Sequence, residues 1–119
     1  MKFKLSEVYS LVKALPKITD KEIPAGVAYR LFKLLKSCSE EMSVLEQARV
    51  KLVEKYAEEK GEGKELQVSD ENKEKFQEEF TTLLNEEIEI KFTPIKIKEF
   101  GDISFSVNDI APLEKIIKD

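Results

Sequence analysis

The stretch MSVLEQARVKLVEKY, from Met42 to Tyr56, carries apolar residues at steps of three and four, the spacing of one face of an α-helix. Extended toward the N-terminus, this register contains, in order, Ala28, Leu31, Leu35, Cys38, Met42, Leu45, Arg49, Leu52 and Tyr56. Every member except Arg49 is apolar or aromatic. The pattern therefore predicts one long helix whose core-facing stripe is interrupted by a single arginine.

The long helix is expected over about residues 24–60, because that range has no internal proline and its one glycine, Gly26, lies near the start. The first half is apolar over a broad arc that includes Phe32, which indicates cover from several sides. The second half narrows to a stripe with charged flanks, which is typical of a helix that pairs with one other helix. Gly61 and Gly63 are expected to end it.

A partner for that stripe lies downstream. A third helix is expected over about residues 70–87, and its apolar face holds Phe76, Phe80, Leu83 and Leu84. Because the loop between the two helices is short and polar, they are expected to form an antiparallel hairpin. The third helix can then cover the narrow half of the long helix.

The remaining elements are short. A first helix is expected over about 7–15, ended by Pro16, and a last helix over about 107–118, capped by Ser106 or Asp109. Alternating apolar and polar residues predict strands over about 88–93, 95–99 and 103–105. We expect an α+β fold in one domain, 1–119: a long central helix in an antiparallel helical hairpin, packed with a small antiparallel or mixed β-sheet and a C-terminal helix.

The charge of the chain is dense and uneven. Of its 119 residues 37% are charged, against a usual quarter, and the net charge is −4. Residues 1–36 hold eight Lys/Arg and three Asp/Glu, a net +5, whereas residues 37–90 hold seven and sixteen, a net −9. Two interpretations stay open: the basic and acidic parts attract each other within the fold, or they form charged docking surfaces.

The residue inventory argues against an enzyme. The chain has no histidine, so it lacks the usual general base near neutral pH and the commonest transition-metal ligand. Its one cysteine, Cys38, falls on the core register and is expected to be a buried, inert thiol. The acidic residues come as adjacent pairs, which point about 100° apart on a helix and do not converge on one site. We expect no catalytic residue, no metal and no cofactor.

Lysines give a second hypothesis. A basic patch could form from the front of the chain and the strand region, with candidate members Lys2, Lys4, Lys13, Lys17, Lys91, Lys96 and Lys98. Such a patch would bind nucleic acid. The net negative charge and the position of the aromatic residues in core registers make nucleic acid the less favoured partner.

The order of several segments resembles an uncharacterised family of small proteins encoded by tailed phages and prophages. The resemblance rests on MKFKLSEVYSLVKAL, IPAGVAYRLFKLLK, EQARVKLVEKYAEEKGEGKELQV, FQEEFTTLLNEE and SVNDIAPLEKIIKD, which together cover nearly the whole chain. It is a likeness of apolar spacing and element order, and the family brings no functional residues. The resemblance implies an accessory protein that acts in a bacterial cytoplasm by binding something.

The protein is expected to be a non-enzymatic phage accessory protein that works through protein–protein contact, as an inhibitor of a host protein, as an anti-defence factor or as a virion-assembly factor. Its partner is a second copy of itself or a host or phage protein. The start of the chain has no signal-peptide pattern and no run is apolar enough for a membrane span, so a cytoplasmic location is expected, in the host if phage-encoded.

Arg49 has three interpretations. Its stem covers apolar surface while its guanidinium reaches solvent or Glu46, one turn earlier. Alternatively it binds a carboxylate of the third helix, such as Glu79 or Glu86, or it contacts a partner protein. The candidate residues for interaction or hairpin register are Arg49, Glu46, Tyr56, Glu54 and Glu58.

Overall fold

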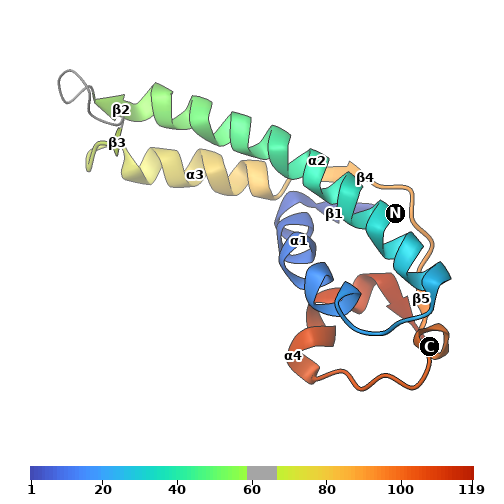
Figure 1. The fold of residues 1–119 in the computed structure, drawn as a ribbon. Helices are drawn as coiled ribbons and strands as arrows, with labels where there is room; N and C mark the ends of the chain where they lie inside the picture. The colour runs from blue at the N-terminus through green and yellow to red at the C-terminus, as the bar shows by residue number, and fades with distance from the viewer. Residues whose placement is uncertain (59–66) are drawn as a thin grey trace.

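The fold is built around one helix, α2 (Ala25–Tyr56), which runs along the whole length of the molecule (Figure 1). The computed structural model describes residues 1–58 and 67–119. The described part measures 57 × 27 × 23 Å. Helix α1 packs against the inner half of α2, the C-terminal helical segments pack on α1, and α3 lies antiparallel beside the outer half of α2. The predicted α+β fold with a long central helix in a helical hairpin is confirmed.

Helix α1 (Leu5–Thr19) is longer than the predicted 7–15, because Pro16 lies inside it rather than at its end. Proline removes one backbone donor but leaves its own carbonyl free to accept. The Pro16 carbonyl accepts the Asp20 amide at 3.1 Å and the Thr19 hydroxyl at 3.2 Å. The extra turn also buries Ile18 completely. Core packing thus carries the helix past the proline.

The hairpin helices are both shorter than predicted. Helix α2 ends at Tyr56 rather than near residue 60. The next two residues, Ala57 and Glu58, form strand β2, which pairs antiparallel with β3 (Gln67–Val68). Helix α3 covers Lys73–Leu84 rather than 70–87. The Asn72 side-chain amide donates to the Tyr56 carbonyl at 3.3 Å, which satisfies the end of α2. The predicted stop at Gly61 and Gly63 lies outside the described residues.

The strands do not form the single small β-sheet that was predicted. Among the described residues they form three two-stranded ladders. β1 (Lys2–Lys4) pairs antiparallel with β4 (Glu87–Glu89), with Phe3 opposite Ile88. β5 (Ile95–Lys96) pairs parallel with β6 (Ile117–Lys118). The predicted strand 88–93 is therefore three residues long, and Pro94 separates two strands that have different partners.

Of the predicted strands 95–99 and 103–105, the first is only two residues long and the second does not form. After β5 the chain turns into a 3₁₀ helix, η1 (Ile97–Phe100), and residues 103–105 form no strand. Packing explains the difference. Phe100 is buried, and Phe105 meets it edge-on with ring centroids 5.4 Å apart. A turn that brings both rings to one side is incompatible with two extended strands at 95–99 and 103–105, and Gly101 provides the turn with φ 79°.

The predicted helix 107–118 is broken into three pieces. These are α4 (Val107–Ile110), the 3₁₀ helix η2 (Ala111–Ile116) and β6. Ser106 caps the start as predicted, because its hydroxyl accepts the Asp109 amide at 3.1 Å. Pro112 lacks the amide that would continue an α-helix, which favours the change to 3₁₀ geometry.

The core lies at the inner end of the molecule. One cluster joins buried side chains from α1, the inner half of α2, and the C-terminal elements; its largest fully buried members are Phe3, Phe100, Leu15, Ile18, Leu31, Leu34, Ile95, Leu113 and Ile116. We call this part the body. We call residues 40–58 and 67–87, which extend outward from it as the helical hairpin, the arm. Of the described arm residues only Leu45 is buried.

Candidate functional site

The arm leaves apolar side chains half-covered. No side chain of α3, all of whose residues the structure describes, is fully buried. Phe76 and Phe80 stack on each other with ring centroids 5.9 Å apart, but both remain partly exposed, as does Leu52 on α2. Two helices give each other one contact face only, so such stripes are covered on one side and open on the other.

An apolar cleft opens where the arm meets the body. It has a volume of about 570 Å³ and we call it the junction cleft. Three helices line it: Tyr9, Val12 and Lys13 from α1; Met42, Leu45, Glu46 and Arg49 from α2; Phe80 and Leu84 from α3. Tyr9 is 49% exposed at its edge, with the Lys13 ammonium 4.4 Å from the ring centroid. The cleft is thus apolar inside and charged at its rim.

Arg49 belongs to that rim. Its Nε donates to Glu46 Oε2 at 2.9 Å and its Nη2 to Glu46 Oε1, so the fork closes on the carboxylate one turn earlier. The predicted contact with Glu46 is present, and the alternative contact with α3 is not made. The hydrogen bonds of Arg49 lower the pKa of Glu46. The Arg49 side chain is 42% exposed and that of Glu46 59%, so water screens the pair.

The contact that joins the two helices lies further out. Tyr56 donates its hydroxyl to Glu79, and Lys55 donates to the same carboxylate at 3.1 and 3.2 Å. The Tyr56 hydrogen bond, followed by that of Lys55, lowers the pKa of Glu79. Donating this hydrogen bond to Glu79 raises the pKa of Tyr56. Glu79 therefore fixes the register of α3 against α2, the role that the sequence suggested for a bond from Arg49.

Another candidate residue of the arm, Glu54, takes no part in these contacts. Glu54 is an exposed residue of α2, and the Glu58 side chain falls outside the described part of the chain. On the opposite face of the arm, a shallow groove of about 640 Å³ lies between α2 and α3. It is lined by Ala48, Lys51, Leu52, Lys55, Glu78, Glu79, Thr82, Leu83 and Glu86. It is more polar than the junction cleft.

A second hollow lies on the body. It has a volume of about 720 Å³, and we call it the basic groove. It runs between the inner half of α2 and the segment after β4, and it is lined by Tyr29, Arg30, Lys33, Leu34, Lys36, Ser37, Glu40, Lys91, Phe92 and Thr93. Arg30 holds the two walls together, donating to the Thr93 carbonyl at 3.0 Å and to Glu99 at 3.3 Å.

The predicted basic patch is not assembled as the sequence suggested. Of its seven lysines, the basic groove receives Lys91 and the junction cleft receives Lys13. The others are exposed on separate elements: Lys2 and Lys4 on β1, Lys17 on α1, Lys96 on β5 and Lys98 on η1. The seven candidate lysines do not include Lys33 and Lys36 of α2, which line the basic groove beside Tyr29. The signal was Tyr29-Arg30 followed by Lys33 and Lys36, three and four residues apart on one helix face.

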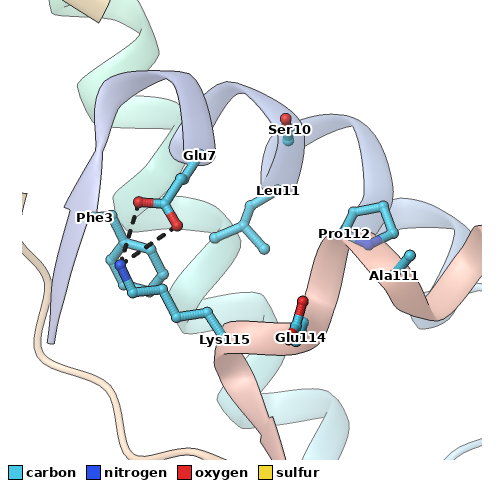
Figure 2. Close-up of a pocket in the computed structure, with 8 residues that line it drawn as sticks. All are labelled: Phe3, Glu7, Ser10, Leu11, Ala111, Pro112, Glu114 and Lys115. Carbon is cyan, nitrogen blue, oxygen red and sulfur yellow. Dashed lines mark hydrogen bonds and ion pairs between the residues drawn. The ribbon is translucent and has the colours of Figure 1, made fainter. Parts of the chain in front are cut away.

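A further hollow, of about 510 Å³, separates α1 from η2 (Figure 2). Lys115 crosses it to reach the Glu7 carboxylate at 3.2 and 3.4 Å, with its ammonium 4.9 Å from the centroid of the Phe3 ring. The Lys4 amide, which donates to Glu7 at 2.9 Å, is the main cause of a lowered pKa for that carboxyl, with Lys115 adding to it. This pair ties the C-terminal elements to α1.

Within residues 1–58 and 67–119, no three Asp, Glu, Cys or His side chains come together in a way that could hold a metal ion. Cys38 is fully buried, and burial, followed by the charge of Glu41, raises the pKa of its thiol to about 11. Among the described helices, none combines the length and apolar character of a membrane span.

Comparison of the chain with protein-family models, with curated proteins and with solved structures finds no match.

Proposed function

We propose that the protein is a non-enzymatic interaction protein whose arm binds an amphipathic helix of another protein. One observation carries this proposal: the apolar stripes of the arm are covered on one side only and meet at the junction cleft. Helical stripes of this kind are buried in bundles of three or more helices. A helix laid against the arm would cover Phe80 and Leu84 and place one large apolar side chain in the cleft.

The charge of the arm favours a foreign partner over a second copy. The described arm residues hold five Lys/Arg and twelve Asp/Glu, a net −7. Pairing two such arms side by side would bring like charges together, which is destabilising. A partner helix with basic flanks would instead be attracted by the negative charge of the arm. The partner chemistry is therefore an apolar face bordered by Lys or Arg.

The resemblance to phage and prophage proteins suggests a setting for this contact. In it the protein acts in a host cytoplasm, and the partner is either a host protein that it inhibits, including a defence protein, or a component of the virion under assembly. Acidic helical surfaces can occupy sites that otherwise hold nucleic acid, which favours a basic host protein. The absence of histidine from the chain supports a role without catalysis.

Site-directed photo-cross-linking tests the proposal. A photo-reactive amino acid replaces Lys13 in the junction cleft or, as matched control, Lys17, which is exposed one turn further along α1 outside the cleft. We expect a specific adduct from position 13 in host lysate and none from position 17. The purified partner should then bind at least about tenfold more weakly to Tyr9→Ala than to the unchanged protein.

Two outcomes would overturn the proposal. Equal adducts from both positions would show that the cleft is not the docking surface. An adduct between two copies of this chain, with a doubled mass in light scattering, would show that the occupant is the protein itself. Circular dichroism of each variant establishes that the fold is kept.

A further inference from the structure

The basic groove carries positive charge that the described part of the protein does not neutralise. Within residues 1–58 and 67–119, no carboxylate lies within ion-pair distance, 4.0 Å, of the ammonium groups of Lys33, Lys36 or Lys91. Arg30 is partly neutralised by Glu99, and Glu40 marks one border of the groove. Three free cations thus converge on one hollow from two segments more than fifty residues apart in the sequence.

Aromatic surface lies beside these cations. Tyr29 is 65% exposed, and the Lys33 ammonium lies 5.5 Å from its ring centroid. Phe32, which the sequence predicted to be covered, is 54% exposed on the same helix. Exposed aromatic side chains are the platforms on which bases stack in proteins that bind single strands. The side chains of Ser37 and Thr93 add hydroxyl groups to the lining.

We propose that the basic groove binds single-stranded nucleic acid, with phosphates at Lys33, Lys36 and Lys91 and a base stacked on Tyr29. Phosphates need mobile cations and hydroxyl donors, and bases need an exposed aromatic face; the groove provides both. An acidic polypeptide would use the cations but would gain nothing from the exposed ring. The acidic arm repels the rest of the strand, so contact stays confined to the body.

This inference goes beyond the proposed function. The groove uses the inner half of α2, up to Glu40, and the segment at Lys91, and it shares no lining residue with the junction cleft. Both surfaces can therefore be occupied at once. A protein that holds a nucleic acid strand at one end and a basic protein at the other would join the two.

Fluorescence anisotropy with a labelled oligothymidylate of about 12 nucleotides tests the proposal. Contacts to about three phosphates predict a log–log slope of binding against salt of about −2 between about 50 and 200 mM. Lys33→Gln, Lys36→Gln and Lys91→Gln should each weaken binding and reduce the slope by about 0.7. Lys51→Gln, an exposed lysine on the arm half of the same helix, is the matched control and should change neither.

Tyr29→Leu separates nucleic acid from other anions. It should weaken oligonucleotide binding by about tenfold with the slope unchanged, because stacking depends little on salt. Absence of binding at the lowest salt, or an equal loss in Lys51→Gln, would overturn the proposal. The proposal would also be overturned if a poly-glutamate peptide bound as tightly as the oligonucleotide and if Tyr29→Leu left the affinity for that peptide unchanged. If the mass of the protein doubles at low salt, and Lys33→Gln restores the mass of a monomer, the occupant of the groove is the acidic arm of a second copy.

Discussion

Arg49 occupies a core register without being a buried charge. Leu45, one turn before it, is the last buried residue of α2, and Leu52, one turn after it, is half-exposed. The core thus ends at Arg49. Its aliphatic stem lines the junction cleft while its guanidinium bends back to Glu46, which is the behaviour expected of a long amphipathic side chain.

We expect Arg49→Leu to change the free energy of unfolding by no more than about 0.5 kcal/mol, because water screens the ion pair that is lost. The matched change Leu31→Ala, on the same register inside the core, should cost about 2–5 kcal/mol. Urea unfolding followed by circular dichroism measures both. A loss for Arg49→Leu as large as that for Leu31→Ala would show that Arg49 holds the hairpin together.

Helix α2 is one continuous element in two environments. Its inner half buries Val27, Leu31, Leu34 and Cys38, whereas its outer half buries only Leu45 and packs against a helix with no buried side chain. Local stability follows the apolar area that each segment removes from water. Local opening of the arm therefore exposes less apolar area, and costs less free energy, than opening of the body.

Native-state hydrogen exchange should divide α2 into these two parts. Amides of α3 and of the outer half of α2 should exchange through local opening, well before those of α1 and the inner half of α2, which should exchange near the global free energy of unfolding. Mass spectrometry of peptides from the exchanged protein measures this. Uniform protection along α2 would contradict the division, and slower exchange of α3 on addition of a partner would mark the docking surface.

The molecule as a whole shows which features a local sequence pattern can predict. The long helix and its hairpin follow from apolar spacing within one segment, so they were predictable. The extension of α1 past Pro16 and the loss of the strand at 103–105 depend on the burial of Ile18 and the contact between Phe100 and Phe105, which are tertiary effects. The basic groove joins α2 to Lys91, and no local pattern connects them.

The pH dependence of stability is a property of the whole chain. With no histidine, stability should change little between about pH 5 and pH 9. Hydrogen bonds lower the pKa of several carboxyls in the folded state, namely Glu7, Glu46, Glu79, Glu89 and Glu99. The unfolded carboxyls, with pKa near 4.3, take up protons first. This stabilisation is therefore complete above that value and is lost as the pH falls through the folded pKa values.

At the alkaline end, Cys38 provides a sharper test. Burial raises the pKa of its thiol from 9.0 to about 11, so the unfolded chain loses that proton first and stability falls as the pH rises from 9 to 11. Cys38→Ala removes this titration but leaves those of the lysines and tyrosines. Its free energy of unfolding should start lower at pH 7, because a cavity remains, yet decline less steeply above pH 9.

The difference in slope between the two proteins should approach about 1.4 kcal/mol per pH unit, the value for one proton. Urea unfolding of both at a series of pH values between 7 and 11 measures it, because the cavity lowers the whole curve of the variant without changing its slope. Parallel curves would mean that the thiol titrates equally in the folded and unfolded chains. The inner half of α2 would then open to water far more readily than its buried side chains imply, and the division of α2 into a stable body and a looser arm would fail with it.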